Sequence, residues 1–477
     1  MLVPLIVASA LFMQNLDSTV VATALPAIAR DFGANPIHLK LALTTYLLTI
    51  AVFLPASGWM ADRFGARMVF RTAIGIFIVG SVLCGVSRSI EMLVFARIVQ
   101  GIGGSMMVPV GRLVVLRTVK KSELVTALSW LTVPALVGPI LGPPVGGFLT
   151  TYASWPWIFW INVPVGFLGI ALATRYVPDL RGEGKVRFDA TGFALVGLGL
   201  AAFMTGSTTL GLNLLPLVAD AVFIAGGAAL LFAYALHARR SDHAILDLRL
   251  FRIPTFWHSV IGGSIFRLGI GATPFLLPLL LQLGFGMTPF QSGLITFATA
   301  AGAVVMKFTA PQIIRRYGFR NVLVVNTVLG AAFTALPAIF VPTTPVTLMV
   351  SLLLVGGFFR SLQFTAVNAL SFADVDQSQM SQATTMTSVA QQVAVSLGIT
   401  VGAIVLQLST TAHGGAITWE VFWPAFVTVG VLTLASGISF WLLAPDAGSE
   451  MSGRPPVPGT DTGKQPAQPP RKPSATK

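Results

Sequence analysis

Residues 58–67 read GWMADRFGAR, and residues 311–320 read PQIIRRYGFR. Arg63, Gly65 and Arg67 in the first stretch each have an identical residue 253 positions later in the second. Each stretch is a short loop between two long apolar runs, so it joins two elements of the same kind. A loop repeated at one fixed offset indicates that the chain is built from two similar halves.

The apolar runs beside these loops recur along the chain at a length of about 20 residues, which as a helix crosses about 30 Å of hydrocarbon. Membrane strands would instead appear as short segments of alternating polarity. Hydrophobic residues make up 54% of the 477 residues and charged residues 10%, whereas an ordinary soluble domain is about a quarter charged. We therefore expect an all-α integral membrane protein.

Fourteen of the apolar runs are long enough to span a membrane. We place them near residues 3–29, 39–61, 68–87, 90–115, 124–150, 157–177, 190–210, 214–237, 255–282, 291–311, 321–341, 345–370, 385–408 and 419–444. Each copy of the repeated loop follows the second span of its half only if the pair at 190–210 and 214–237 is set aside. The predicted plan is two six-helix bundles plus two extra central helices, which makes 14 transmembrane helices.

The distribution of Lys and Arg among the loops predicts the orientation in the membrane. The loops on one side, together with the tail, hold 22 of the 30 Lys and Arg residues, and the loops on the other side hold 3. Basic loops stay in the cytoplasm, so we expect both termini there. The net charge of +13 then reflects membrane topology and not nucleic-acid binding.

These patterns divide the chain into four predicted segments. They are an N-terminal six-helix bundle at 1–177, cytoplasmic loops with the two extra helices at 178–254, a C-terminal six-helix bundle at 255–444, and a tail at 445–477. The tail is rich in Pro, Gly, Ser and Thr, lacks apolar periodicity and is expected to be disordered.

Asp17 and Arg97 lie inside predicted spans, where an unpaired charge costs several kcal/mol. Burial favours the neutral form of a carboxylic acid, so Asp17 could take up and release a proton near neutral pH. At 1.5 Å per residue, Arg97 enters the fourth span about 10 Å deep, within reach of Asp17, and Gln100 lies one turn further. We expect Asp17 and Arg97 to couple transport to protons. The alternative is a structural ion pair that fixes span one against span four.

The loop at 58–67 predicts a gate. Gly58 has no side chain, so another helix can approach it closely, and Asp62 can pair with a cation or a helix N-terminus. Such a latch would hold one access state and break in the other. The alternative is a basic turn that only sets topology. The residues assigned to the latch are Gly58, Asp62, Arg63, Gly65 and Arg67.

Span five contains VGPILGPPVGG at 137–147. Its glycines permit close helix contact, and its prolines remove amide donors and bend the helix. This combination suits a hinge between the two halves, although the glycines alone would be ordinary membrane packing. The residues assigned to the hinge are Gly138, Gly142, Pro143, Gly146 and Gly147.

The chain resembles the major facilitator superfamily, and within it the 14-span drug:proton antiporters of the EmrB and QacA type. The resemblance covers nearly all of 1–445 and is greatest to the MdtD and HsrA-like branch. It is carried by FMQNLDSTVVATALPAIA (12–29), SGWMADRFGAR (57–67), RIVQGIGGSMMVPVGRL (97–113), VGPILGPPVGG (137–147) and SWPWIFWINVPVG (154–166).

The resemblance implies the major facilitator fold, rocker-switch alternating access and proton-coupled export. It also implies that Asp17 and Arg97 serve proton transfer, that 58–67 is a gating motif, and that 137–147 marks an antiporter. It does not fix the substrate.

The charges within or near the spans are mostly positive. The cations are Arg97, Arg112, Arg267, Lys307 and Arg360, and the acids are Asp17 and Asp220. If Arg267 and Arg360 face the cavity, it favours anionic, zwitterionic or neutral amphiphiles over dications. Alternatively, these arginines bind carbonyls or lipid head groups, and Lys307 extends to the cytoplasm. For Asp220 we expect only a local role. The substrate-binding candidates are Gln14, Asn15, Gln100, Arg267, Gln282, Arg360, Gln363 and Asn368.

The predicted function is proton-driven export of small amphipathic compounds, either drugs or toxic metabolites. Two alternatives stay open: a dedicated exporter of a metabolite, siderophore or antibiotic, and a non-transporting membrane sensor. The chain lacks GxxxxGK[ST], HExxH and a nucleophile–base–acid set, so we expect no enzyme, no metal and no cofactor, with energy from the proton motive force. The expected partners are the lipid bilayer of a bacterial inner membrane, a small-molecule substrate and, as an open option, a periplasmic adaptor protein.

Overall fold

Helices make up the architecture of the computed structural model, which describes residues 2–118, 124–178, 188–210, 214–241, 243–376 and 379–449. No strand occurs in these ranges. Most of the predicted tail at 445–477 lies outside them. Thirteen helical runs within the described residues are long and apolar enough to cross a membrane. The predicted span at 124–150 coincides with a further helix, Leu124–Tyr152. The all-α membrane architecture is therefore confirmed.

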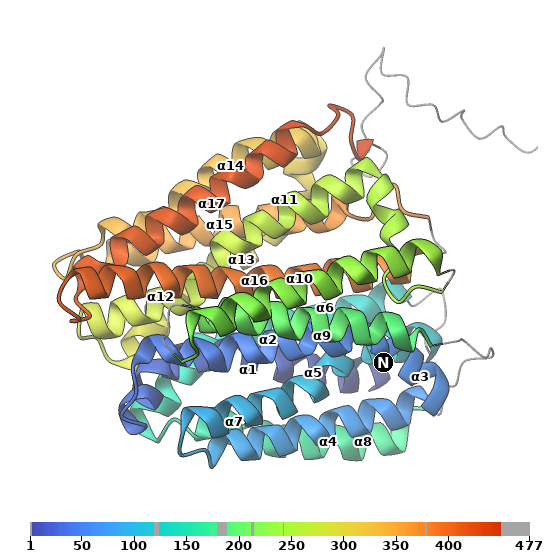
Figure 1. Cartoon of the computed structure of the whole chain (residues 1–477), viewed down its shortest axis with the longest axis horizontal. Coiled ribbons are helices and arrows are strands. Elements are labelled where there is room, and N and C mark those ends of the chain that lie inside the picture. The colour runs from blue at the N-terminus through green and yellow to red at the C-terminus, as the bar shows by residue number, and fades with distance from the viewer. Residues whose placement is uncertain are drawn as a thin grey trace, which may run out of the picture.

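The helices form two lobes with a pair of helices between them (Figure 1). The N-terminal lobe contains α1 (Leu2–Asp31), η1 (Pro36–Leu39), α2 (Lys40–Phe53), η2 (Leu54–Ala56), α3 (Ser57–Phe64), α4 (Ala66–Gly85), α5 (Ile90–Thr118), α6 (Leu124–Tyr152), α7 (Trp157–Trp160) and α8 (Asn162–Tyr176). The middle pair is α9 (Ala190–Thr209) and α10 (Leu217–Arg240).

The C-terminal lobe follows the middle pair. It contains η4 (Leu248–Arg252), α11 (Pro254–Gly271), α12 (Thr273–Leu279), η5 (Leu280–Gly284), α13 (Pro289–Tyr317), α14 (Phe319–Ala335), η6 (Leu336–Ile339), α15 (Val346–Leu370), α16 (Met380–Ala412), η8 (Trp419–Phe422) and α17 (Trp423–Trp441). The η5 segment is a turn of π-helix that extends α12.

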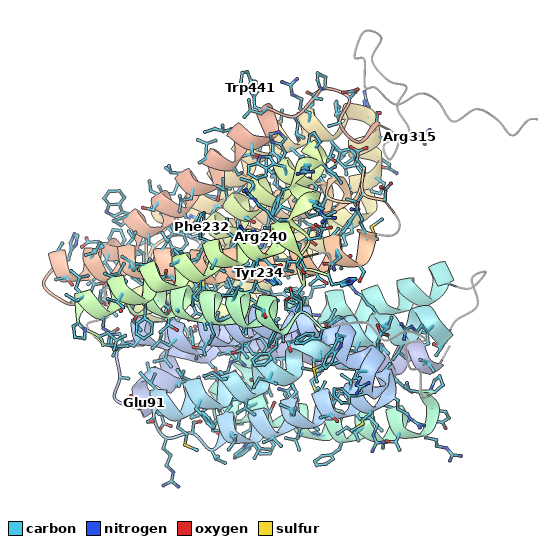
Figure 2. The ribbon with its side chains drawn as sticks, turned by 45° about the vertical axis from the view of Figure 1, so that its right-hand side comes forward. Glu91, Phe232, Tyr234, Arg240, Arg315 and Trp441 are labelled. Atoms are coloured by element: carbon cyan, nitrogen blue, oxygen red, sulfur yellow. The ribbon has the colours of Figure 1, made fainter. Side chains whose placement is uncertain are left out.

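The middle pair packs across the boundary between the lobes. Helix α9 contacts α2 of the N-terminal lobe and α16 of the C-terminal lobe. Figure 2 shows Phe232, Tyr234 and Arg240 of α10 between the lobe that carries Glu91 and the lobe that carries Arg315. The two extra helices therefore contact both halves instead of forming a separate body.

The repeated loop has the same backbone in both lobes. Gly65 ends α3 and begins α4 with φ +92°, and Gly318 ends α13 and begins α14 with φ +77°. Each glycine N–H donates to the carbonyl four residues earlier, and each glycine carbonyl accepts from the N–H four residues later. A left-handed residue between two helices strongly favours glycine, which explains why both copies of the sequence contain it.

These two glycines define one end of the bundle, here called the basic end, and the loops around Asn35 and Gly286 define the opposite end. At the opposite end, the lobes share a hydrophobic core that combines Val20 and Leu25 of α1 with Phe275 and Leu279 of α12. In Figure 1, α11, α14 and α17 slope away from the N-terminal lobe toward the end where the N-terminus lies. The lobes thus share one core at the opposite end, and a second core, which includes Tyr46 of α2 and Met386 of α16, spans them toward the basic end.

Candidate functional site

A buried ion pair lies in the middle of the N-terminal lobe. Arg97 of α5 donates from Nη1 to Oδ2 of Asp17 on α1, with 2.6 Å between the atoms. Asp17 is 1% exposed and Arg97 is 0% exposed. Arg97 also donates from Nε to the carbonyl of Ala42 on α2, at 3.0 Å. The structure thus places these two predicted site residues in direct contact.

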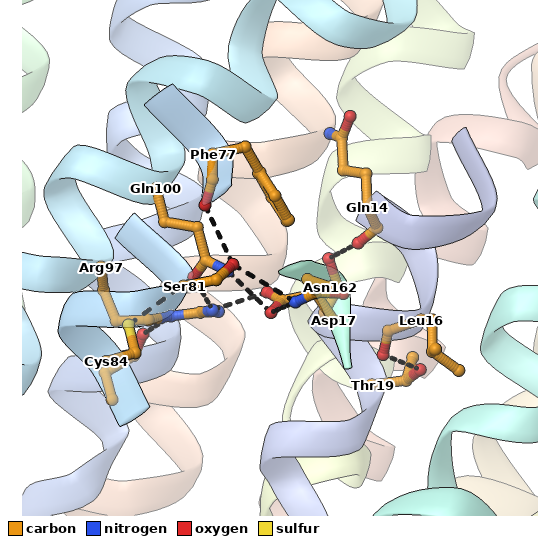
Figure 3. A network of polar contacts seen from close by, with 12 residues as sticks. Gln14, Leu16, Asp17, Thr19, Phe77, Ser81, Cys84, Arg97, Gln100 and Asn162 are labelled. Atoms are coloured by element: carbon orange, nitrogen blue, oxygen red, sulfur yellow. Dashed lines mark hydrogen bonds and ion pairs between the residues drawn. The ribbon is translucent and has the colours of Figure 1, made fainter. Parts of the chain in front are cut away.

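Two amides complete the contacts of the Asp17 carboxylate (Figure 3). Gln100 and Asn162 each donate an N–H to Oδ1, at 2.8 Å and 3.0 Å. Gln100 also donates to Ser81 of α4 and accepts from Arg97. With donors from α5 and α8, both oxygens of this buried carboxylate are hydrogen-bonded.

Three members of this network were missed by the sequence analysis. Asn162 lies at the start of α8, Ser81 lies on α4, and the ring of Tyr46 lies 4.1 Å from the Arg97 guanidinium. Asn162 was recognisable only as a polar residue in an apolar run, because nothing in the sequence indicates which helix faces Asp17. Gln100, predicted as a substrate ligand, lies in this network and not at the cavity described below.

At the basic end, Asp62 forms an ion pair with Arg117 at the end of α5, at 2.8 Å. Both side chains are partly exposed, at 26% and 33%. The packing reason given for Gly58 is wrong in this state, since Gly58 is exposed and a Cβ there would meet nothing within 4 Å. Arg63 is exposed, and no ion pair of Arg63 is found within the described ranges. Arg67 is half-buried.

The glycines of span five contact α1 and α13. A Cβ at Gly138 would lie 3.0 Å from Leu16 and Asn15, and one at Gly142 would overlap Thr19. Gly146 likewise packs against Val20 and Thr23 of α1, whereas Gly147 packs against the carbonyl of Pro289 at the start of α13. Pro143 packs its carbonyl against Gly293 of α13. One helix therefore touches its own lobe along one stripe and the other lobe at its end.

A cavity of about 450 Å³ lies between the two lobes. Its lining comes from α1, α6, α12, α13, α15 and α16. Toward the opposite end, α6 and α13 close it, because Phe290 donates its backbone N–H to Thr151 at 3.1 Å and packs its ring against Phe148 and Tyr152. Gln282 of η5 also donates to the carbonyl of Thr23, at 2.9 Å.

Two predicted substrate residues, Arg360 and Asn368, line this cavity together with Lys307 and Gln391. Arg267 lies directly behind the lining: it donates from Nη2 to Oδ1 of Asn368 at 2.7 Å, and its guanidinium lies 5.3 Å from the Phe364 ring centre.

The other substrate candidates are placed elsewhere. Gln363 is fully buried against α14, where it bonds Asn326 and Thr327. Gln282 joins the lobes through Thr23. Gln14 and Asn15 are not among the residues that line the cavity. For these positions the structure contradicts the predicted cavity contact, because adjacent polar residues on one helix point to different sides.

The ion pair and the cavity lie on different sides of α1. Asp17 faces α5 and α8, whereas Thr19, Ala22 and Thr23 line the cavity. At 3.6 residues per turn, positions two, five and six residues after Asp17 fall on the far side of the helix. Helix α1 therefore forms part of both sites.

A second buried acid lies in the middle pair. Asp220 is 2% exposed and accepts a hydrogen bond from Thr209, at 2.6 Å. Lys40 is fully buried at the start of α2, and its Nζ has no hydrogen-bond partner in the described part of the chain. Asp220 is the neighbouring acid that acts on it electrostatically.

Comparisons with known proteins agree with this geometry. The family model described as Major Facilitator Superfamily matches residues 7–399 and 259–475. A relative named multidrug resistance protein MdtD, from Salmonella heidelberg, is 38% identical over 453 residues, which are 94% of this chain and 95% of that protein.

Two solved structures share the fold at low sequence identity. A mutant of the nucleoside transporter NupG has a TM-score of 0.67 at 14% identity and covers 92% of this chain and 100% of its own. A D-xylose–proton symporter has a TM-score of 0.66 at 14% identity and covers 93% of this chain and 98% of its own.

Proposed function

The chain belongs to the major facilitator superfamily, as its motifs predicted, and from this we propose that it is a proton-coupled exporter of small amphipathic compounds that works by alternating access. The observation that carries the proposal is the Asp17 carboxylate, buried in a membrane helix with Arg97, Gln100 and Asn162 as its donors. An ionisable group at that depth has a large solvation cost and is retained where a function needs it.

Proton uptake at Asp17 has a defined structural consequence. The neutral acid no longer attracts Arg97, which is then a buried cation without a counter-charge. Losing one charge of a buried pair is strongly unfavourable unless the surroundings rearrange. Because α1 carries both Asp17 and the wall of the cavity, rearrangement around the acid changes the cavity without contact between proton and substrate.

The basic loops support a cytoplasmic location of the basic end. Since the lobes meet at the opposite end, the described state then corresponds to a cavity that receives substrate from the cytoplasm. Both termini are expected in the cytoplasm. A reporter enzyme that is active only outside the cytoplasm should therefore stay inactive when fused after residue 449, and activity there would reverse the assignment.

Proton-coupled flux in liposomes that contain only the purified chain tests the proposal. With an inward proton gradient and a panel of amphipathic substrates, the wild type should show substrate-dependent proton movement. Asp17→Asn should abolish it, because its side chain cannot be ionised. Asp220→Asn combined with Lys40→Met, which removes a buried acid together with its neighbouring cation, is the matched control and should retain flux.

Equal flux by the wild type and Asp17→Asn would remove Asp17 from the mechanism. No proton-linked flux with any substrate of the panel would favour the sensor alternative. Flux that appears only after a periplasmic extract is added would indicate an adaptor protein. The driving force is the proton motive force, so an uncoupler should stop transport in every coupled case.

A further inference from the structure

The charged groups in the cavity are all of one sign. Among the described residues that line it, Arg360 of α15 and Lys307 of α13 are ionisable cations, and neither Asp nor Glu occurs. The two cations line the same cavity from neighbouring helices, because Ser361 of α15 donates its hydroxyl to the carbonyl of Ala303 on α13 at 2.9 Å. The nearby acid Asp17 is neutralised by Arg97 on the far side of α1.

The half-buried Arg360 differs from the buried arginines Arg97 and Arg267. Arg97 has three hydrogen-bond acceptors and Arg267 has Asn368, whereas no hydrogen bond or ion pair of Arg360 is found within the described part of the chain. An unpaired guanidinium at membrane depth is costly unless water or an anion meets it. The cavity therefore already contains a cation that can bind an anionic group of the substrate.

The neighbouring polar groups are arranged as donors. Arg267 donates to Oδ1 of Asn368, which orients the amide, and Nδ2 of Asn368 is a donor that an anionic ligand can accept from. The positive charge of Arg267 lies one residue behind the lining and adds to the same potential. Anion recognition in proteins uses such combinations of guanidinium, ammonium and amide donors.

Apolar side chains make up a large part of the remaining wall, beside several threonines. Pro139, Pro143, Leu277, Pro278 and Phe364 face the cavity from three helices. A volume of about 450 Å³ falls within the range of small-molecule sites, which combine apolar walls with few polar anchors. The occupant should therefore carry an apolar body as well as a charged head.

We propose that the exported substrate is an amphipathic organic anion, with a carboxylate, sulfonate or phosphate head at Arg360 and Lys307 and an apolar body against α6 and α12. This inference rests on the proposed export function and names the substrate class of the same cavity. An anionic lipid head group offers the same chemistry, but the site described here lies between the lobes and is assigned to a small amphiphile.

The anion class has a consequence for the charge moved per cycle. If one proton enters for each substrate that leaves, a monoanion moves two positive charges inward, a neutral substrate one and a monocation none. Because the membrane potential acts on every charge that moves, it then drives anion export more strongly than neutral export. Currents from oriented liposomes should follow that order.

Equilibrium binding of three probes with one shared apolar body tests the class directly. The probes are naphthalenesulfonate, naphthamide and naphthyltrimethylammonium, titrated calorimetrically into the full chain in phosphatidylcholine nanodiscs. The sulfonate should bind at least about tenfold more tightly than either of the others, as expected for a charge-assisted hydrogen bond. This comparison uses only the wild type, so it does not depend on how a variant folds.

Variants then locate the head group. Arg360→Gln should weaken sulfonate binding by about tenfold and leave naphthamide binding unchanged, while Arg360→Lys should retain most of the affinity. Arg112→Gln removes an exposed membrane cation that does not line the cavity, and is the matched control with unchanged binding.

Equal affinities for the three probes, or wild-type sulfonate affinity in Arg360→Gln, would overturn the proposal. Loss of sulfonate binding when phosphatidylglycerol replaces phosphatidylcholine would assign the site to lipid and also overturn it. Proton-coupled flux of the ammonium probe without any of the sulfonate would support export but reject the anion. Tight Arg360-dependent sulfonate binding without Asp17-dependent flux would support the anion class and reject proton-coupled export.

Discussion

Asp17 accepts N–H groups from three residues on two other helices, so its charge is what joins α1 to α5 and α8 in the buried network. A proton on this carboxylate removes its negative charge and turns one of its two acceptor oxygens into a donor, so the three N–H groups lose an ionic partner. The same atoms therefore stabilise one arrangement of helices while Asp17 is ionised and oppose it when Asp17 is neutral. An ion pair that only fixes the helices would not need an arrangement that depends on the protonation of Asp17.

Removing one charge of this pair should lower the stability of the fold more than removing both charges. Arg97→Gln leaves a buried carboxylate without its cation, a change that costs about 3–5 kcal/mol in other buried pairs. Asp17→Asn combined with Arg97→Gln replaces the pair by two neutral amides, which can bond Gln100 and Asn162. Thermal unfolding in detergent should show a large decrease in Tm for Arg97→Gln and substantial recovery in the double variant.

Proton-coupled flux should stay absent in both of these variants, since neither keeps the acid with its cation. This separates the structural role from the coupling role. If the double variant regained flux along with stability, the pair would only fix the helices. If its Tm stayed as low as that of Arg97→Gln, the two side chains would not act as a pair.

A contact between two side chains could be predicted from the sequence only where their depths in the membrane are enough to show that they meet. The Asp17–Arg97 contact follows from counting residues along antiparallel spans, because both positions and the length of the arginine side chain are known. Asn162 could not be found in this way, since its depth is shared by polar residues on several helices. Gln363 was assigned to the cavity because polarity within a span does not tell which neighbour the side chain faces.

For the helices, the sequence does not show which face of each helix points toward the cavity and which toward its neighbours. Helices that are apolar on all sides have no polar stripe to indicate the cavity side. The glycines of α6 are an exception, because close approach leaves a sequence signal: Gly138, Gly142 and Gly146 recur every four residues and all pack on α1. The sequence predicted tight packing there, but not that α1 would be the partner.

Gly142→Val should therefore be among the most damaging changes in α6. Its Cβ would overlap the side chain of Thr19, and the added methyl groups would force α1 and α6 apart. Overpacking of this kind costs about 1–3 kcal/mol or more. We expect a lower yield of monodisperse protein, a lower Tm and loss of flux.

Gly226→Val is the matched control. Gly226 lies on α10, and a Cβ there would meet nothing within 4 Å, so the yield and the Tm should stay close to those of the wild type. Equal Tm decreases in the two variants would mean that valine in a membrane helix is harmful by itself. The α1–α6 contact would then not be the cause.

The whole molecule shows why the repeated loop was informative. A positive φ between two helices requires glycine almost regardless of the neighbouring residues, so Gly65 and Gly318 mark equivalent positions in two lobes of different sequence. The number of spans and the fold follow from that repeat and from the apolar runs. How the lobes are tilted does not, because alternating access requires two arrangements of one sequence with similar free energies.

Alternating access requires the lobes to separate at the opposite end in each cycle. Thr151 and Phe290 touch there, across the boundary between α6 and α13. Cysteines at both positions, oxidised to a disulfide, should hold the cavity closed at that end and stop transport, and a reductant should restore it. Cys84 is the only native cysteine and is buried, so it should not interfere.

Each single-cysteine variant should transport normally under oxidation. A crosslinked protein that still transported at the wild-type rate would show that the lobes need not part at this contact, and that the cavity has another exit.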